Sequence, residues 1–183
     1  MQHTINFSAA INQSTVNGLI SNCLSAINQG ASELVIHMSS PGGDLVSGFT
    51  AYHFLKSLPV QVHTHNLSNV ESVANIIFLA GSKRTGTTGC RFLFHPFHWG
   101  LMGTSVDHTR VSEWSASLDN DLERYIDILE SETDGLKSRE DWKKIISSAT
   151  IATATTAVEW GLMSAAENAK MPLAPGTYWG IMG

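Results

Sequence analysis

The stretch from residue 33 to residue 44 reads Glu-Leu-Val-Ile-His-Met-Ser-Ser-Pro-Gly-Gly-Asp. Its first half is a short apolar run, which is typical of a buried strand. The Pro-Gly-Gly that follows marks a tight turn, and residues 45–58 predict a helix that ends before Pro59. The stretch therefore predicts a strand that passes through a glycine turn directly into a helix.

The same alternation extends on both sides of this stretch. On the N-terminal side we expect a strand over 4–9, then a helix that begins behind Asn12 or Ser14 and closes at Gly30. On the C-terminal side we expect, in order, a strand over 60–65, a turn over 66–69, a helix over 71–80 and a strand over 91–94. Alternating strands and helices predict an α/β fold of repeated βαβ units with right-handed crossovers around a mostly parallel sheet. No linker or repeat interrupts the pattern, so we assign residues 1–183 to a single domain.

Composition narrows the class of protein. The 183 residues are 43% hydrophobic and only 15% charged, which fits a globular chain with a substantial core. The net charge of −5 and the absence of a basic cluster argue against nucleic-acid binding. Cys23 and Cys90 have no CxxC partner and are expected to be small buried residues in a reducing compartment. The first residues show no secretory signal and no apolar run is long enough for a membrane span, so we expect a cytoplasmic protein.

Residues 107–133 differ from the rest of the chain. Apolar side chains recur there at steps of three or four, with carboxylates on the other faces. The pattern predicts a protruding amphipathic helix of about six turns or more, at ~3.6 residues per turn. Its apolar stripe would pack either against another subunit or along the sheet of its own chain, and periodicity favours neither.

Three segments carry residues suited to catalysis. The glycine turn lets a peptide-like ligand approach the main chain, although a tight turn without any ligand has the same sequence. Ser72 lies near the start of the predicted helix over 71–80, where a serine is either a helix cap or a nucleophile beside free N–H groups. His95 ends the predicted strand over 91–94, at a sheet edge where a catalytic base is often found.

The chain has eight histidines, and four of them are paired closely in sequence. His63 and His65 share one face of a strand, whereas His95 and His98 flank Pro96. A metal site built from these four is conceivable, but no cysteine or carboxylate accompanies them at a local ligand spacing. We therefore expect no metal and no other cofactor, and we interpret the histidines other than His95 as surface or capped side chains.

Taken together, these segments resemble the proteolytic subunit of the Clp protease, a family of the crotonase-like fold. Residues 34–43 resemble the family's "YINSPGG" strand and turn, and residues 71–81 resemble its "ASMGAFLLAAG" nucleophile helix. Residues 81–84 and 92–96 are similar to "G.KGKR…MIHQP", and residues 157–162 resemble "AVEYGL". The resemblance runs from about residue 4 to about residue 165, in the family's order.

This resemblance implies a serine endopeptidase that hydrolyses unfolded proteins or peptides within a ring oligomer. It places Ser72 on the family's nucleophile and His95 on its base, and it implies that the backbone N–H groups of Gly43 and Val73 form the oxyanion hole. Lys83 matches the family's structural "KGKR" turn, which argues against a Ser–Lys dyad. An acyl-CoA enzyme on the same fold would use the oxyanion hole without a Ser–His pair.

The match departs from the family at the triad's acid. The expected position is Ile145, which cannot orient an imidazole, and Asp141 one turn earlier is a weak substitute. Without an acid, His95 would take its tautomer from a backbone carbonyl, at a cost in activity. The segment that contacts the family's AAA+ ATPase is also missing from the sequence, which leaves open whether such a partner is needed. The alternative function is an inactive Clp-like subunit that supports an active paralogue.

Overall fold

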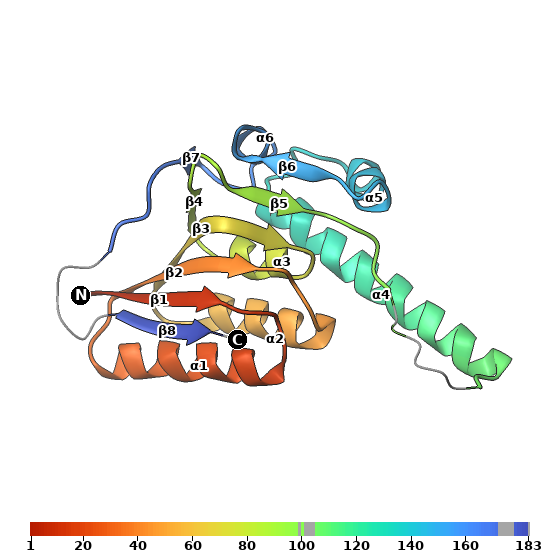
Figure 1. The fold of residues 1–183 in the computed structure, drawn as a ribbon, viewed down its shortest axis with the longest axis horizontal. Coiled ribbons are helices and arrows are strands. Elements are labelled where there is room, and N and C mark those ends of the chain that lie inside the picture. The colour runs from red at the N-terminus through yellow and green to blue at the C-terminus, as the bar shows by residue number, and fades with distance from the viewer. Residues whose placement is uncertain (99, 101–104, 172–177, 183) are drawn as a thin grey trace.

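The computed structural model describes residues 1–98, 100, 105–171 and 178–182, and within these ranges its centre is one eight-stranded sheet (Figure 1). The main path of the sheet has the order β6-β5-β3-β2-β1-β8, and β4 and β7 extend it from β3. All strand pairs are parallel except β5 with β6, which confirms the mostly parallel sheet. The strands are β1 (Gln2–Ser8), β2 (Glu33–Ser40), β3 (Gln61–Glu71), β4 (Lys83–Gly86), β5 (Arg91–Leu93), β6 (Ile151–Thr153), β7 (Ala165–Ala166) and β8 (Tyr178–Met182).

The helices alternate with these strands. They are α1 (Gln13–Asn28), α2 (Leu45–Ser57), α3 (Ala74–Leu79), α4 (His108–Glu132), α5 (Arg139–Ser147) and α6 (Ala154–Glu159). In Figure 1, α1, α2 and α3 lie along the sheet, whereas α4 extends away from it toward one side. A continuous apolar core joins the sheet to these helices, so the α/β fold predicted from the alternation is confirmed.

Local sequence explains where the helices begin and end. Asn12 caps α1 through a reciprocal capping box with Thr15, and Gly30 follows the helix with a φ of +85°. Asp44 caps α2 by accepting a hydrogen bond from the Ser47 N–H, and this helix stops two residues before Pro59. The predicted boundaries of α1 and α2 are therefore right to within a few residues.

The predicted turn over 66–69 is wrong, because β3 continues through it to Glu71. Asn66 and Asn69 favoured the prediction of a turn, but their side chains are hydrogen-bonded to neighbouring residues of β3 and β5. The Asn66 amide donates to the Arg91 carbonyl at 3.0 Å, and its Oδ1 accepts from the Ser68 N–H. The first part of β3 pairs with β4 and its last part pairs with β5, so tertiary pairing outweighs the local turn preference.

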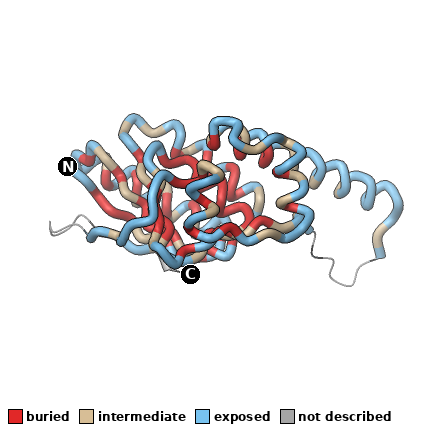
Figure 2. The backbone as a smooth tube through the Cα atoms, turned by 90° about the horizontal axis from the view of Figure 1, so that it is seen from above, coloured by how far each residue is buried: buried red, intermediate tan, exposed pale blue. Residues whose placement is uncertain are grey.

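The helix predicted over 107–133 is confirmed as α4, and its two halves have different environments. In the second half, Tyr125, Ile126, Ile128 and Leu129 are buried against the chain's own core. The first half projects beyond the body, and its Val111 is 52% exposed (Figure 2). Packing on its own chain therefore accounts for only the second half of the apolar stripe.

The two cysteines are buried and unpaired, as their spacing predicted. Burial raises the pKa of the Cys90 thiol to about 11 and that of the Cys23 thiol to about 12, so both remain protonated near neutral pH. No helix in the described ranges combines the length and apolar character that a membrane crossing requires.

Candidate active site

The glycine turn after β2 forms one wall of the site, and steric constraints fix its sequence. Gly42 and Gly43 have φ values of +85° and +150°, which side chains rarely allow. A Cβ on Gly43 would lie 2.2 Å from the Ile11 carbonyl oxygen, and a Cβ on Gly42 would lie 2.7 Å from the Ser72 Cβ. The turn is held by hydrogen bonds on both sides of Ile11, which donates to the Gly42 carbonyl at 2.8 Å and accepts from the Asp44 N–H at 2.9 Å. The turn backbone therefore lies directly beside Ser72, with no room for a side chain at Gly42.

Ser72 occupies a sharp turn between β3 and α3. Its φ of +56° lies in the left-handed region, which is unusual for a residue other than glycine. Its N–H donates to the Leu93 carbonyl at 2.8 Å, which ties the turn to β5. The helix starts only at Ala74 and has no side-chain cap, so the interpretation of Ser72 as a helix cap is wrong. The hydroxyl makes no hydrogen bond to any described residue, which leaves it available to a ligand.

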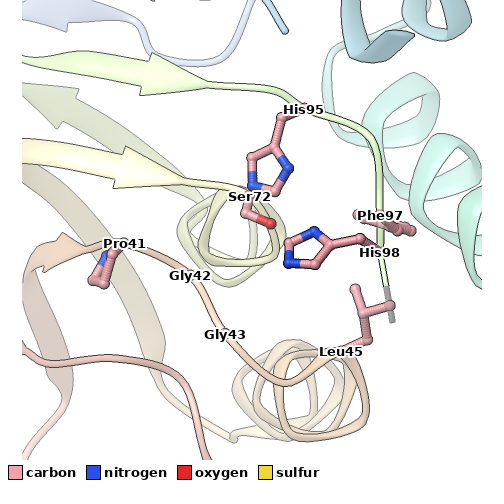
Figure 3. Close-up of a pocket in the computed structure, with 8 residues that line it drawn as sticks. All are labelled: Pro41, Gly42, Gly43, Leu45, Ser72, His95, Phe97 and His98. Carbon is pink, nitrogen blue, oxygen red and sulfur yellow. The ribbon is translucent and has the colours of Figure 1, made fainter. Parts of the chain in front are cut away.

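His95 follows the end of β5 on the opposite side of Ser72 from the glycine turn (Figure 3). Its Nδ1 lies 2.8 Å from the Pro96 carbonyl oxygen. A carbonyl only accepts hydrogen bonds, so this contact places a proton on Nδ1. In the neutral ring Nε2 then carries the free lone pair, which is the tautomer that a base acting on a serine needs.

A pocket of about 370 Å³ joins these elements. It is lined by Pro41, Gly42, Gly43, Leu45, Ser72, His95, Phe97 and His98. Figure 3 shows the Ser72 hydroxyl pointing into it, between the rings of His95 and His98. Within the described ranges no hydrogen bond joins Ser72 Oγ to either ring. Hydrogen bonds between catalytic groups are often long or poorly aligned in structures without a ligand.

Two backbone donors next to Ser72 have no hydrogen-bond partner among the residues that the structure describes. Neither the Gly43 N–H nor the Val73 N–H donates a hydrogen bond to a described residue. Free N–H groups beside a reactive hydroxyl are suited to binding an oxyanion. The structure thus brings a hydroxyl, a histidine of fixed tautomer and the Gly43 N–H together around one pocket, with the Val73 N–H in the peptide next to Ser72.

Comparisons with known proteins identify the family of the chain. A model of the family described as Clp protease matches residues 1–168. The chain belongs to the Clp protease family. Proteolytic subunit 2 of the ATP-dependent Clp protease from Treponema denticola is 33% identical over 76 residues, which is 40% of this chain and 38% of that protein. Proteolytic subunit 3 from Rhodococcus jostii is 27% identical over 103 residues, 55% of this chain and 50% of that protein.

These matched segments span between about two fifths and half of the curated relatives' length. Among solved structures, a point mutant of ClpP1 from Listeria monocytogenes superposes with a TM-score of 0.81 at 18% identity and covers 92% of each chain. At that identity the superposition establishes a ClpP-like fold and nothing finer.

Among the described residues, no carboxylate is hydrogen-bonded to His95 as the acid of the Clp protease triad would be. Asp141, the weak candidate from the sequence, lies at the start of α5 and accepts a hydrogen bond from the Ser138 hydroxyl at 2.7 Å. This capping contact holds the pKa of Asp141 below its usual value. Ile145, at the expected position of the acid, packs against the apolar core. The structure therefore does not bring Asp141 to His95, and the hydrogen-bond partner of Nδ1 is the Pro96 carbonyl.

The paired histidines lie in two different pockets. His63 and His65 line a second pocket with Lys83, on a part of the sheet that contributes nothing to the Ser72 pocket. A metal site shared by all four paired histidines is thus ruled out by their placement, and Lys83 is away from the serine. His98 is the residue that the sequence interpretation missed, because it lines the Ser72 pocket with its ring centroid 6.0 Å from that of His95.

Proposed function

We propose that this Clp protease family member is a serine endopeptidase in which Ser72 is the nucleophile and His95 is the base. The observation that carries the proposal is the position of Ser72, which lines a pocket with His95 and Gly43 and is followed directly by Val73, whose N–H has no partner among the described residues. Strained backbone at φ +56° costs about 1–3 kcal/mol and tends to persist where it serves a function.

In the proposed reaction, the Ser72 oxygen attacks the carbonyl carbon of a peptide bond while His95 Nε2 takes its proton. The negative oxygen of the tetrahedral intermediate accepts hydrogen bonds from the N–H groups of Gly43 and Val73. The intermediate collapses as the imidazolium gives its proton to the leaving amine, which leaves an acyl group on Ser72. Water, deprotonated by His95, then releases the acid product.

The Pro96 carbonyl takes the place of the triad's carboxylate in this scheme. It fixes the tautomer, because Nδ1–H donates to it at 2.8 Å. It carries no charge, however, so it stabilises the imidazolium less than a carboxylate would. We therefore expect slower turnover than a complete triad gives, with unfolded polypeptide as the substrate and no cofactor.

Assembly into a ring of identical subunits is the second part of the proposal. The first half of α4 projects from the body and keeps apolar Val111 exposed, which supports contact with a neighbouring copy in a family whose members form rings. Sedimentation-velocity analysis of the purified chain tests this directly. A monomer at micromolar concentration would contradict it.

A fluorophosphonate probe tests the catalytic assignment. It reacts with an activated serine, so we expect labelling of the wild-type chain at Ser72 and no labelling of Ser72→Ala. Hydrolysis of a small acetate ester and of unfolded casein should both disappear in Ser72→Ala. Failure of wild-type Ser72 to react at any pH between 6 and 9 would disprove the assignment.

The missing carboxylate favours a second candidate function, that of an inactive subunit beside an active paralogue. The same measurements separate the two. Turnover by the homogeneous wild-type chain that depends on Ser72 eliminates the inactive subunit, whereas a folded but unreactive chain supports it.

A further inference from the structure

A buried hydrogen-bonded pair, Asn75 and Tyr125, holds the main chain of Ser72 from outside the pocket. Tyr125 Oη donates to the Ser72 carbonyl at 3.0 Å. The Asn75 amide donates to Tyr125 Oη at 2.9 Å and to the Leu93 carbonyl at 3.0 Å. Asn75 is 0% exposed and Tyr125 is 1% exposed, and neither lines the Ser72 pocket. Asn75 of α3 thus links β5 to Tyr125 of α4, and the Tyr125 hydroxyl binds the Ser72 carbonyl.

The Ser72 carbonyl belongs to the same peptide group as the Val73 N–H. A trans peptide is planar, so its C=O and N–H point in opposite directions. Whatever fixes the carbonyl oxygen therefore also fixes the direction of the N–H. The oxygen accepts a second hydrogen bond from the Asn75 N–H at 3.0 Å, so two donors orient this plane.

The Val73 N–H is one of the two unpaired donors of the site. Hydrogen bonds to the carbonyl of a peptide also polarise it, which strengthens its N–H as a donor. Tyr125 is thus placed to act on the orientation and the strength of this donor, although it is not itself among the residues that line the pocket. Burial raises the pKa of Tyr125 well above its usual value, which keeps its hydroxyl protonated and able to donate.

The satisfaction of the Asn75 amide supports a role other than packing. Its NH₂ makes two hydrogen bonds, whereas its Oδ1 is buried without a partner among the described residues. A buried unpaired acceptor costs about 1–3 kcal/mol, which an apolar side chain of similar size would avoid. Asn75 carries this cost, and both of its N–H donors are used in hydrogen bonds around Ser72.

We propose that Tyr125, oriented by Asn75, is a positioning residue that aims the Val73 N–H at the oxyanion. This inference rests on the proposed function, because it assumes that Ser72 is the nucleophile and Val73 an oxyanion donor. It adds that the long helix α4 is connected to the reaction centre through one hydroxyl group.

The test is Tyr125→Phe, which removes the hydroxyl and keeps the ring. Removal of a whole oxyanion donor lowers kcat by about 10²–10³-fold, so misorientation of a donor that remains is expected to lower kcat by about 10–100-fold. KM and the pH midpoint of kcat should stay unchanged, because Tyr125→Phe keeps the ring that packs on the pocket residue Phe97 and removes no hydrogen bond to His95. Affinity for a peptide boronate, whose tetrahedral adduct occupies the oxyanion hole, should fall by a factor similar to that in kcat.

The matched control is Tyr52→Phe. Tyr52 is also buried, and its hydroxyl donates to Glu132 at 2.6 Å. It belongs to the second half of α2, whereas the glycine turn precedes the first residue of this helix. Its loss removes a buried tyrosine hydroxyl and leaves the Ser72 peptide untouched. We expect kcat per reactive serine, counted by fluorophosphonate titration, to remain within about twofold of the wild type.

Asn75→Ala is the second variant, and it keeps the inference testable if Tyr125→Phe folds poorly. It should lower kcat less than Tyr125→Phe does, and the double variant should equal Tyr125→Phe rather than the product of the two effects. An unchanged kcat per titrated serine in Tyr125→Phe, or multiplicative effects in the double variant, would overturn the inference while leaving Ser72 as nucleophile. A wild-type chain that does not react with the probe overturns the proposed function, and this inference falls with it.

Discussion

Among the described residues, histidines line two pockets, and the rings of the two pockets differ in exposure and in the groups that they contact. In the first, His95 is partly exposed and His98 is exposed beside the strained Ser72. In the second, His37 and His65 are 2% and 4% exposed, with their ring centroids 5.5 Å apart. The residue type is the same, but the surroundings give the rings different properties.

In the second pocket, burial lowers the pKa of His37 and of His65. Burial, and then the nearby His65, lower the pKa of His37 to about 4. His65 Nδ1 contacts the Thr85 hydroxyl at 2.7 Å, and His63 pairs with Glu33 at 2.9 Å. A base for catalysis needs a free nitrogen that can reach a nucleophile. In the first pocket the Ser72 hydroxyl has no hydrogen bond to a described residue, whereas in the second the Thr85 hydroxyl already contacts buried His65.

The largest expected effect is the loss of His95. General-base catalysis typically contributes about 10²–10⁴-fold, so His95→Gln should lower kcat for the small ester by that factor. The comparison predicts that His63→Gln, which removes a histidine from the other pocket, leaves kcat within about twofold. His98→Gln decides which histidine of the first pocket is the base, since Nδ1 of His95 is held by Pro96. A larger loss in His98→Gln than in His95→Gln would contradict the assignment.

The next largest effect concerns the glycine turn, whose backbone forms one wall of the first pocket. Gly43→Ala would place a Cβ 2.2 Å from the Ile11 carbonyl oxygen, in a backbone region that is nearly exclusive to glycine. We expect a loss of about 3 kcal/mol or more in the free energy of unfolding, measured by urea denaturation, because backbone must move.

Gly89→Ala is the control for this prediction. A Cβ on Gly89 meets no atom within 4 Å, so its free energy of unfolding should change by about 0.5 kcal/mol or less. Equal stability of the two variants would mean that the glycine turn can accommodate a side chain. The steric explanation for glycine at position 43 would then be wrong.

Sequence patterns predict the frame of this fold but only part of the site. Apolar runs, caps and glycines suffice for β1, α1, β2, α2 and α4, because those signals are local. The continuation of β3 through Asn66 depends on partners in β5, which lie 25 residues away for the Asn66 amide. No local pattern reports such a partner.

The same distinction holds within the site. The motifs predicted Ser72, His95 and Gly43 as members of one site, and the structure places all three around one pocket. The left-handed φ of Ser72, the carbonyl of Pro96 as the partner of His95, and the contact of Tyr125 with Ser72 depend on three-dimensional placement. His98 was interpreted as a surface or capped residue because it matches no motif of the family and no metal-ligand spacing; it is exposed, but it also lines the Ser72 pocket.

The third prediction uses pH to sharpen the comparison. His37 has a pKa of about 4 in the folded chain against 6.5 for an ordinary histidine, so between these values the unfolded chain binds more protons. Stability should therefore fall as pH drops from 6.5 toward 4, by about 1.4 kcal/mol for each unit of pKa difference at most. His65, whose pKa burial also lowers, acts in the same direction.

Urea midpoints measured at intervals from pH 7.5 to pH 4.5 provide the check. His37→Gln removes one titrating group and should reduce the slope of stability against pH in this range. An identical slope in the wild type and in His37→Gln would show that the buried histidines do not control acid stability.

The smallest expected effect is that of the His63–Glu33 pair at the rim of the second pocket. Its side chains are 21% and 33% exposed, and pairs that remain open to water typically contribute about 0–1 kcal/mol. Glu33→Gln should therefore lower the free energy of unfolding by about 0.5 kcal/mol at neutral pH, and added salt should reduce even that difference. Kinetics of ester hydrolysis should not change, because the pair lies outside the Ser72 pocket. A change in kcat on losing this carboxylate would mean that the two pockets are coupled, and the distinction between a reactive and an inert group of histidines would no longer hold.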